Sequence, residues 1–399
     1  MTATTEQVEN RRTTRARNLF LVANNIEEVG GLQRVVHTLA EGFARRGHRV
    51  ELIGVAPGPP GEHLRPGPGY TTSTLGPGEP KEWVRRGIRN KLRPVKQAKD
   101  LVRRRIHARH VARLQKRFDA VADGLVIVGQ IWAMQWVADA DTRHLRVIGM
   151  SHEAYEASRG LLPTAIGSTR YRRIMQLYPP IDSVLLLTEA DARKFEQDGL
   201  CNVGVMPNPL PVWPERTSPL TERKVVAIGR LEVEKRYDRL IEAWRQVSER
   251  HPDWRLEIYG SGSLDRTLRA QIASSGLSET AALLGPTGDV AGVLGGASAL
   301  ALSSEQEGLP LVLVEAMACG VPCVAFDCVP GIREIIRDGE DGLVVTNRDV
   351  DALAAGICRL IEDEPLRREL GSRARVNIER FSMDNVLDRW ERLFDEVER

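Results

Sequence analysis

The amino-acid sequence predicts an α/β protein of two domains, each built around a parallel sheet. Short apolar segments alternate along the chain with longer segments in which apolar residues recur at helical spacing. This alternation is typical of parallel sheets that carry helices on both faces. It stops near Asn208, in a proline-rich polar segment, and then starts again. We therefore expect two Rossmann-like domains with a central cleft.

The expected N-terminal domain covers residues 18–208 and follows a polar, disordered tail at residues 1–17. Its first strand, NLFLVAN, leads through a loop with two glycines into the helix LQRVVHTLAEGFARRG, which Gly47 ends. Later strands are expected at HRVELIGV, GLVIVG, RVIGM and SVLLLT, because each is a short apolar run.

A proline-rich linker at residues 209–222 is expected to join this domain to a C-terminal domain at residues 223–380. There the strand KVVAIG precedes the helix YDRLIEAWRQV, and the strand WRLEIYG precedes the helix SLDRTLRAQIASSG. Further strands are expected at ALALSS, CVAF and GLVV. Residues 381–399 contain a last amphipathic helix, whose place the pattern alone does not fix.

The composition is that of an ordinary soluble protein, with 42% hydrophobic residues, 28% charged residues and a net charge of +2. No apolar run reaches the roughly 18–20 residues that a membrane-spanning helix needs. The N-terminus lacks the apolar core of a secretory signal. Three of the five cysteines cluster without a nearby histidine, which favours reduced, buried thiols over a zinc site. These observations predict a cytoplasmic protein.

Residues 81–117 depart from this average, because fifteen of them are Lys or Arg and only Glu82 and Asp100 are acidic. Apolar residues among the cations predict one or two basic amphipathic helices. These residues are Ile88, Leu92, Leu101, Val102, Ile106 and Val111. The segment is either a solvated helical face or a patch for an anionic membrane surface or a polyanionic acceptor. Nucleic acid is not expected, because interleaved aromatic residues and a recognition module are lacking in the sequence.

Three segments follow predicted strands, where the ligands of open α/β sheets bind. In NNIEEVGGLQR, Gly30 and Gly31 precede a helix and can admit an anion to its N–H groups, although an ordinary turn has the same residues. In GRLEVEKRYD, Arg230 and Lys235 lie on one strand–helix loop, which favours phosphate binding over two solvated cations. In MSHEAY, His152 follows a strand end, as a structural histidine or as a residue of the cleft.

A fourth segment, SSEQEGLPLVLVEAMACGVP, predicts a site for an anion and for hydroxyl groups together. Pro310 suits the first turn of a helix, whose N–H groups near 309–312 carry positive potential. Glu307 precedes this helix, and Glu315 lies in its apolar run, where a carboxylate needs a hydrogen-bonding partner. Acids beside a phosphate site are useful if they bind hydroxyls. A sugar nucleotide offers both groups, as a diphosphate and as the hydroxyls of ribose and hexose.

These motifs resemble those of the family 4 glycosyltransferases, which have the GT-B fold, over almost all of residues 18–395. The most specific is EGLPLVLVEAMACGVP, in which seven residues separate Glu307 from Glu315. GRLEVEKRYDRLIEAW is similar to the family's phosphate-binding segment, and VGGLQRVVHTLAEGFARRGHRVELI to its N-terminal Gly-Gly loop. MPNPL and FDCVPGIREIIRDGEDGLVV are similar to the start of its linker and to a glycine loop of its C-terminal domain.

The resemblance implies a role for each candidate residue. Arg230 and Lys235 would hold and neutralise the donor diphosphate, and Glu307 would contact hydroxyls of the donor sugar. Glu315 would bind the ribose, and His152 would lie near the C6 hydroxyl of the sugar. The donor would also contact the chain at Gly30, Gly31, Gly308, Leu309, Pro310 and Leu311. The last helix would cross back onto the N-terminal domain.

The implied reaction is a retaining transfer of a hexose from a nucleotide-diphosphate sugar to an acceptor hydroxyl, by a front-face route and with no metal or other cofactor. The triplet Asp139–Ala140–Asp141 precedes a strand instead of following one, so we expect it on the surface. A UDP-sugar is the favoured donor, with a GDP-sugar as the alternative. The expected acceptors are a lipid-linked saccharide, a cell-envelope glycan or a teichoic-type polymer at the inner face of the cytoplasmic membrane.

Other functions stay open at this point. The acceptor could be a soluble natural product, the enzyme could be an epimerase or a phosphorylase, or the chain could bind a sugar nucleotide without catalysis. The loop VPGIRE also departs from the resemblance, because Pro330 and Ile332 stand where the family often has more glycine. We expect a stiffer loop there, which puts the donor-sugar contacts near Gly331 in doubt.

Overall fold

The computed structural model describes residues 15–28, 30–58, 64–76, 93–160 and 167–399. The chain divides into two compact units, which are described separately. Unit 1 comprises Met1–Ser151, Arg173–Val184 and Leu387–Arg399, and unit 2 comprises His152–Arg172 and Leu185–Val386. The chain forms two sheets of parallel strands, which confirms the predicted α/β class.

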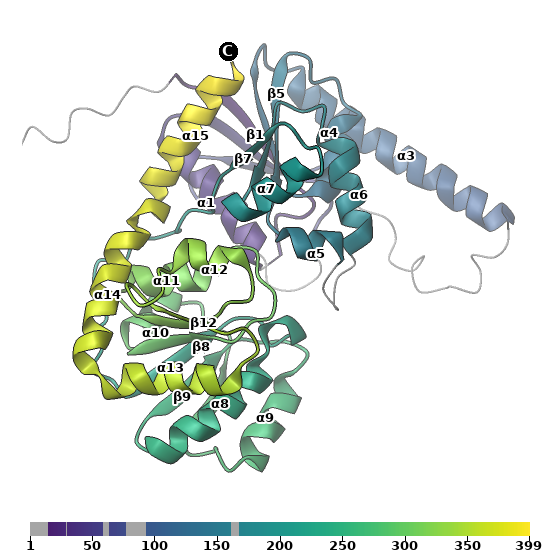
Figure 1. The fold of residues 1–399 in the computed structure, drawn as a ribbon. Coiled ribbons are helices and arrows are strands. Elements are labelled where there is room, and N and C mark those ends of the chain that lie inside the picture. Colours follow the sequence, from purple (N-terminus) through teal and green to yellow (C-terminus); the bar gives the residue numbers. More distant parts are fainter. Residues whose placement is uncertain (1–14, 29, 59–63, 77–92, 161–166) are drawn as a thin grey trace, which may run out of the picture. The chain divides into compact units, whose positions relative to one another are not determined.

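The first sheet has seven strands in the order β3-β2-β1-β4-β5-β6-β7 (Figure 1). They are β1 (Asn18–Ala23), β2 (Arg49–Gly54), β3 (Thr71–Thr74), β4 (Gly124–Val128), β5 (Leu145–Ser151), β6 (Ser183–Leu186) and β7 (Val203–Val205). In β1, Leu19 stands opposite Val50 on one side and Leu125 on the other, and both neighbours run parallel to it.

Helices follow most of these strands. They are α1 (Gly31–Arg45), α3 (Arg93–Phe118), α4 (Ile131–Ala138), α5 (Tyr155–Arg159), α6 (Gly167–Leu177) and α7 (Glu189–Gln197). The apolar face of α1 is buried as its spacing predicts, with Val35, Leu39 and Phe43 at 3% exposure or less. Gly47 follows the end of α1 at φ +91°, a left-handed conformation that only glycine adopts easily.

α3 carries most of the basic segment and corrects its prediction as an amphipathic helix. Its C-terminal part is anchored by His110, Leu114 and Phe118, which are buried one turn apart. More than two turns earlier, Leu101 and Val102 are 54% and 36% exposed. The apolar residues are too few among the cations to share one buried face, and this part of α3 projects from unit 1 (Figure 1). Ile88 and Leu92 lie outside the described residues.

The second sheet, in unit 2, has six strands in the order β10-β9-β8-β11-β12-β13. They are β8 (Lys224–Ile228), β9 (Arg255–Tyr259), β10 (Ala281–Gly285), β11 (Ala299–Leu302), β12 (Cys323–Phe326) and β13 (Leu343–Val345), and every neighbouring pair is parallel. The strand order reverses between β8 and β11. Ligands of open α/β sheets bind at such a switch point, outside the carboxyl ends of the strands.

Helices cover the second sheet on both faces. They are α8 (Tyr237–Arg250), α9 (Asp265–Ser274), α10 (Val290–Gly295), α11 (Leu311–Ala318), α12 (Pro330–Ile335), α13 (Val350–Glu362) and α14 (Glu364–Ile378), and the chain ends with α15 (Met383–Val397). One apolar cluster joins the sheet to α8 and α13, for example through Trp244 and Ile357. A second cluster joins it to α11 and α14, for example through Leu313 and Ala374. The last helix, α15, begins in unit 2 and ends in unit 1.

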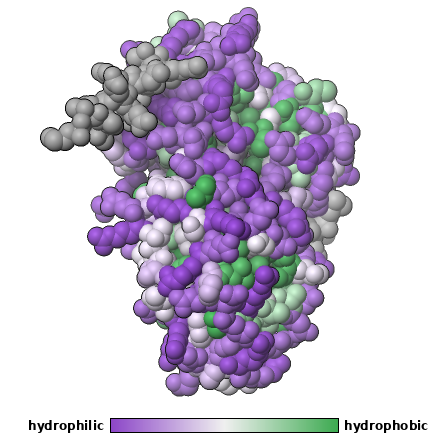
Figure 2. All heavy atoms as spheres, turned by 60° about the vertical axis from the view of Figure 1, so that its left-hand side comes forward, coloured by the Kyte–Doolittle hydropathy of each residue, from purple (hydrophilic) through white to green (hydrophobic). Residues whose placement is uncertain are grey.

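The segment between the two sheets, residues 206–223, contains no helix or strand. Among the helices that the structure describes, none is both long and apolar enough to cross a bilayer. On the face shown in Figure 2 hydrophilic residues predominate, and hydrophobic residues form separate areas instead of a continuous band.

Candidate functional site in unit 2

An ion pair between Lys235 and Glu307 lies at the switch point of the second sheet. Lys235 ends the short 3-10 helix η2 (Val233–Lys235) in the loop after β8, and Glu307 lies in the loop after β11. The Lys235 Nζ is 2.6 Å from the Glu307 Oε1, which also accepts a 2.6 Å hydrogen bond from the Ser304 hydroxyl. The two charged side chains are only 17% and 10% exposed. The structure thus brings together two of the predicted site residues.

A second set of charges holds the two loops in place, and the sequence analysis did not find it. Glu305 bonds Arg236 at 2.9 Å and also pairs with Arg348. Both arginines have positive φ angles, +50° and +67°, which cost a residue with a side chain about 1–2 kcal/mol. Burial disfavours the charge of Glu305, but the arginines outweigh it and hold the pKa of that carboxyl below its usual value. Only the local density of charges in the sequence could have indicated this network.

Arg230 lies on the same loop as Lys235 but pairs with a different carboxylate. Its side chain is 72% exposed, and its guanidinium donates to the Glu234 carboxylate at 2.6 Å. An exposed pair of this kind contributes little to stability, so Arg230 can leave Glu234 for a ligand at small cost.

Gly308 is the point at which two loops of unit 2 meet. A Cβ on Gly308 would come within 2.3 Å of the His152 carbonyl oxygen, so no other residue fits without a backbone shift. Gly331, in the first turn of α12, also packs on this junction, because a Cβ there would be 2.9 Å from the Gly308 carbonyl oxygen. The predicted residues His152 and Gly308 are therefore neighbours.

The His152 imidazole is buried without a hydrogen-bonding partner. Neither of its ring nitrogens makes a hydrogen bond of sound geometry, and the Oδ1 of Asn208, which is 5% exposed, is also unpaired. Burial lowers the pKa of His152 to about 4, although the Asn208 side chain opposes this shift. The ring is therefore neutral at pH 7. Unpaired buried polar atoms are costly unless a ligand satisfies them.

α11 begins beside this junction, with Pro310 as its N-terminal cap and not within its first turn as predicted. Leu309, Pro310 and Leu311 thus pass from the Glu307 loop into the helix, whose first N–H groups lack acceptors within the helix. Glu315 is half-buried, as are Leu311 and Val312 on the same side of α11. This partial exposure explains how α11 accommodates a carboxylate within its apolar run.

The departure at Pro330 has a simple structural explanation. Val329 caps α12, and Pro330 occupies its first turn, where the missing N–H is not needed. The stiffer loop that the sequence predicts is therefore the start of a helix.

Gly30 and Gly31 belong to unit 1, where Gly30 caps α1 and Gly31 is its first residue. A Cβ on Gly31 would meet nothing within 4 Å. The aspartates of the triplet at 139–141 are exposed, as expected, and each has a basic partner. Asp139 bonds His107 at 2.6 Å, and Asp141 pairs with Arg143 at 2.5 Å.

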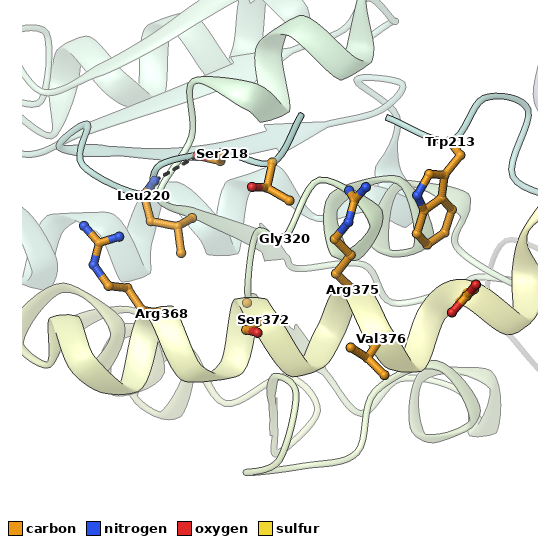
Figure 3. Close-up of a pocket in the computed structure, with 11 residues that line it drawn as sticks. Trp213, Ser218, Leu220, Gly320, Arg368, Ser372, Arg375 and Val376 are labelled. Carbon is orange, nitrogen blue, oxygen red and sulfur yellow. Dashed lines mark hydrogen bonds between the residues drawn. The ribbon is translucent and has the colours of Figure 1, made fainter. Parts of the chain in front are cut away.

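A cavity of about 500 Å³ lies elsewhere in unit 2, between α14 and the chain segment at residues 213–220 (Figure 3). Arg375 packs over the Trp213 ring at 4.9 Å and donates to the Pro214 carbonyl, and Arg368 donates to the Pro219 carbonyl. Both arginines thus hold that segment on α14. None of the residues that line the cavity belongs to the Lys235 or Glu307 loops.

Two protein-family models match the chain, one on each side of residue 213. "Glycosyltransferase Family 4" matches residues 29–212, and "Glycosyl transferases group 1" matches residues 214–377. The chain belongs to glycosyltransferase family 4. The glycosyltransferase motifs that the sequence analysis identified lie within these matched ranges.

Curated relatives place this glycosyltransferase among proteins named for cell-envelope and extracellular glycans. An exopolysaccharide phosphotransferase of Streptomyces coelicolor is 40% identical over 55% of this chain and 24% of its own length. A poly(ribitol-phosphate) α-N-acetylglucosaminyltransferase of Staphylococcus aureus is 30% identical over 54% of this chain and 44% of its own. An uncharacterized glycosyltransferase of Haemophilus influenzae is 24% identical over 92% of this chain and 96% of its own length.

Solved structures support the GT-B fold of the glycosyltransferase. A TarM mutant of S. aureus, crystallised with fondaparinux, α-GlcNAc-glycerol and UDP, has a TM-score of 0.77 at 17% identity and covers 95% of this chain and 99% of its own. HepE of Anabaena, crystallised with UDP and glucose, has a TM-score of 0.72 at 20% identity, with the same coverage. At such identities the likeness concerns the fold.

Proposed function

We propose that this glycosyltransferase moves a hexose from a nucleotide-diphosphate sugar to an acceptor hydroxyl, with retention of configuration and without a metal ion. The observation that carries the proposal is the Lys235–Glu307 pair at the switch point of the second sheet, with a contact of 2.6 Å. A cation beside a carboxylate suits a ligand in which phosphates adjoin hydroxyls. A UDP-sugar is the favoured donor, ahead of a GDP-sugar.

In the proposed reaction the bond between the anomeric carbon and the diphosphate oxygen breaks first. Lys235 leaves Glu307, and Arg230 leaves Glu234, to neutralise the departing diphosphate. Glu307 then accepts hydrogen bonds from the donor-sugar hydroxyls. The acceptor hydroxyl attacks the same face of the sugar and passes its proton to a diphosphate oxygen, so the step needs no separate base.

The remaining predicted residues have positioning roles in this proposal. The neutral His152 ring would exchange its unpaired state for a hydrogen bond to the C6 hydroxyl of the sugar. Glu315 would bind the ribose. Backbone groups at residues 30–31 and 308–311 would contact the phosphates and the sugar.

The proposed acceptor is a cell-envelope glycan, a lipid-linked saccharide or a teichoic-type polymer at the inner face of the cytoplasmic membrane. Relatives named for exopolysaccharide and poly(ribitol-phosphate) support this class. The exposed basic part of α3 supports an anionic acceptor or membrane surface, because residues 103–105 are three consecutive exposed arginines.

Nucleotide release from UDP-, GDP-, TDP- and ADP-sugars tests the proposal. We expect one donor to be preferred and Glu307→Gln to slow its turnover by at least about 100-fold. Glu242→Gln, the same change on the exposed face of α8, serves as the control and should leave turnover unchanged. Wild-type turnover in Glu307→Gln would contradict the site, and loss of turnover in a chelator while the chain stays folded would contradict the metal-free mechanism.

A further inference from the structure

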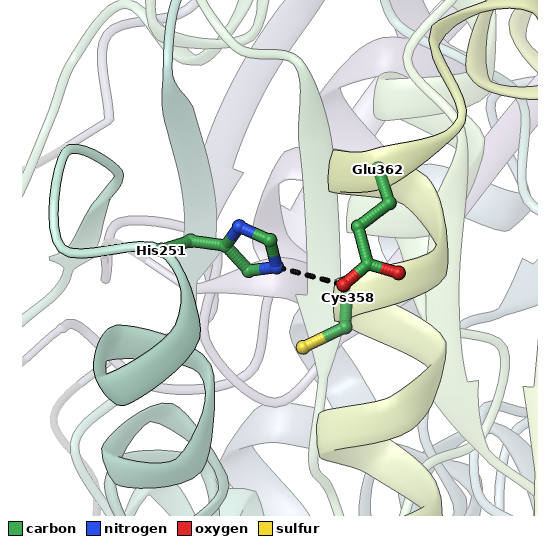
Figure 4. Close-up of side chains that lie close together, drawn as sticks. All are labelled: His251, Cys358 and Glu362. Atoms are coloured by element: carbon green, nitrogen blue, oxygen red, sulfur yellow. Dashed lines mark hydrogen bonds and ion pairs between the residues drawn. The ribbon is translucent and has the colours of Figure 1, made fainter.

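Three side chains of different chemistry meet in unit 2, outside the loops of Lys235 and Glu307. They are His251, which follows the end of α8, and Cys358 and Glu362, one turn apart on α13 (Figure 4). One donor atom of each, a ring nitrogen, the sulfur and a carboxylate oxygen, lies within 4.8 Å of the others. The His251 Nε2 is already 3.0 Å from the Glu362 Oε1. Within the described part of the chain this is the one group of three that could hold a metal ion.

The donor set selects among metals. Nitrogen, thiolate and carboxylate together suit a borderline ion such as Zn²⁺, whereas Mg²⁺ and Ca²⁺ require oxygen donors. In a tetrahedral zinc site the sulfur and nitrogen ligands are about 3.5 Å apart, as follows from bonds of about 2.3 and 2.0 Å. The donor atoms lie within 4.8 Å of one another, so side-chain rotations that move them by about 1 Å would complete the site.

The surroundings also fit a metal site. The side chain of His251 is 18% exposed and that of Glu362 is 44% exposed, so an ion can enter from solvent, while Cys358 is buried at 3%. Arg250 donates to the Glu362 Oε1 at 2.5 Å. A carboxylate that binds a metal usually accepts such an outer hydrogen bond, which orients it.

We propose that His251, Cys358 and Glu362 bind one Zn²⁺ ion, with water in the fourth position. On binding, the Cys358 thiol loses its proton to solvent and the neutral His251 ring donates its Nε2 lone pair. The ion ties the C-terminal end of α8 to α13. α8 has 14 residues, so its two ends are about 21 Å apart, and Lys235 precedes the other end. The ion therefore stabilises unit 2 and takes no part in sugar transfer.

Titration of the full-length, tag-free chain with Co²⁺ as a spectroscopic substitute for Zn²⁺ tests the proposal. We expect one ion per chain, a thiolate-to-cobalt absorption band, and displacement of the cobalt by Zn²⁺ but not by Mg²⁺. Cys358→Ser should abolish the band and weaken Zn²⁺ binding by more than about 100-fold, because loss of an outer partner alone costs 10- to 100-fold. Cys201→Ser, at an exposed cysteine, is the control and should retain the band.

His251→Gln provides a second test, because a change at this partly exposed residue leaves the core intact even if Cys358→Ser fails to fold. It should weaken Zn²⁺ binding and remove the rise in melting temperature that Zn²⁺ gives the wild type. A wild type without the thiolate band would overturn the proposal, as would wild-type zinc affinity in either variant.

Discussion

At the scale of single residues, the Lys235 and Glu307 loops of unit 2 are held by contacts that leave little freedom. Lys235 and Glu307 neutralise each other, so in the proposed reaction the donor replaces an internal ion pair. In the proposed exchange the anionic diphosphate takes the place of the Glu307 carboxylate beside Lys235, and hydroxyl donors take the place of the ammonium group beside Glu307. The loops themselves must stay in place while this exchange occurs.

Gly308→Ala should disturb the junction with His152. The new Cβ would be 2.3 Å from a backbone oxygen, and overpacking of this kind typically costs about 1–3 kcal/mol. We expect a lower urea midpoint and reduced donor turnover. Gly295→Ala is a matched control, since a Cβ there meets nothing within 4 Å. Equal midpoints for the two variants would show that the loops separate more easily than the structure indicates.

Arg236 should respond to substitution in a way that exposes its backbone strain. Arg236→Ala and Arg236→Gly both lose the bonds to Glu305 and Asp238, but glycine also relieves the positive φ. We expect the glycine variant to be more stable by about 1 kcal/mol in urea denaturation. At Arg245, inside α8, the alanine variant should instead be more stable than the glycine variant by about 1 kcal/mol, because glycine weakens a helix. If the alanine and glycine variants had the same order of stability at both positions, the backbone strain at Arg236 would be refuted.

His152 should make stability depend on pH. Its folded pKa of about 4 lies below the ordinary 6.5, so the unfolded chain binds more protons between these values. The free energy of unfolding therefore falls as pH drops from 6.5 to 4, by up to about 3 kcal/mol. His152→Gln should remove this part of the slope. Burial raises the pKa values of the nearby Glu153 and Asp191 carboxyls. Both carboxyls are present in wild type and variant, so their contribution to the pH dependence cancels in the comparison.

At the scale of elements, the end of α15 is fixed to unit 1 by a buried charge cluster. Arg17 is 6% exposed and contacts Glu391 at 3.0 Å, Asp395 at 2.5 Å and Glu398 at 3.0 Å. His48 bonds the other oxygen of Glu391 at 2.6 Å. The aromatic rings of Trp390 and Phe394 pack beside them on Phe43.

Arg17→Ala should therefore lower the free energy of unfolding strongly. It leaves the buried Glu391 without its cation, and breaking such a pair typically costs about 3–5 kcal/mol. Arg15→Ala breaks a pair with Asp123 whose side chains are 69% and 65% exposed, so it should cost at most about 1 kcal/mol. Thermal unfolding of both variants measures the contrast. A mild effect at Arg17 would mean that the aromatic contacts alone hold α15.

α3 offers a test of the proposed anionic surface. Arg104→Glu with Arg105→Glu reverses two exposed charges of the projecting part without touching its buried anchor. Because each cation near an anionic membrane contributes about 1 kcal/mol, vesicle binding at low salt should fall by more than about tenfold. Reversing the exposed Arg216 and Arg266 of unit 2 controls for net charge. An equal loss of vesicle binding in both double variants would show that α3 is not the anionic-surface site.

At the scale of the whole molecule, the sequence predicted what periodicity and motif spacing determine. Strand–helix alternation predicted both sheets, and the positions of Lys235 and Glu307 after strand ends predicted that each lies at the ligand-binding edge of the sheet. The network around Glu305 was not predictable, because it joins residues 236, 305 and 348 through backbone angles that no periodicity encodes. The amphipathic interpretation of α3 was wrong because spacing counts apolar positions but does not show what covers them.

The path of the chain through unit 1 also affects how the protein is made. The last thirteen residues, Leu387–Arg399, belong to the same unit as the first strand and supply Trp390 and Phe394, both fully buried, to its core. A ribosome adds roughly 5–20 residues per second, so Trp390 and Phe394 are synthesised some tens of seconds after Phe43, on which they pack. The first unit to emerge is thus the last to be completed. A nascent chain that stops shortly before its end carries an open apolar surface on its oldest part, which chaperones would recognise.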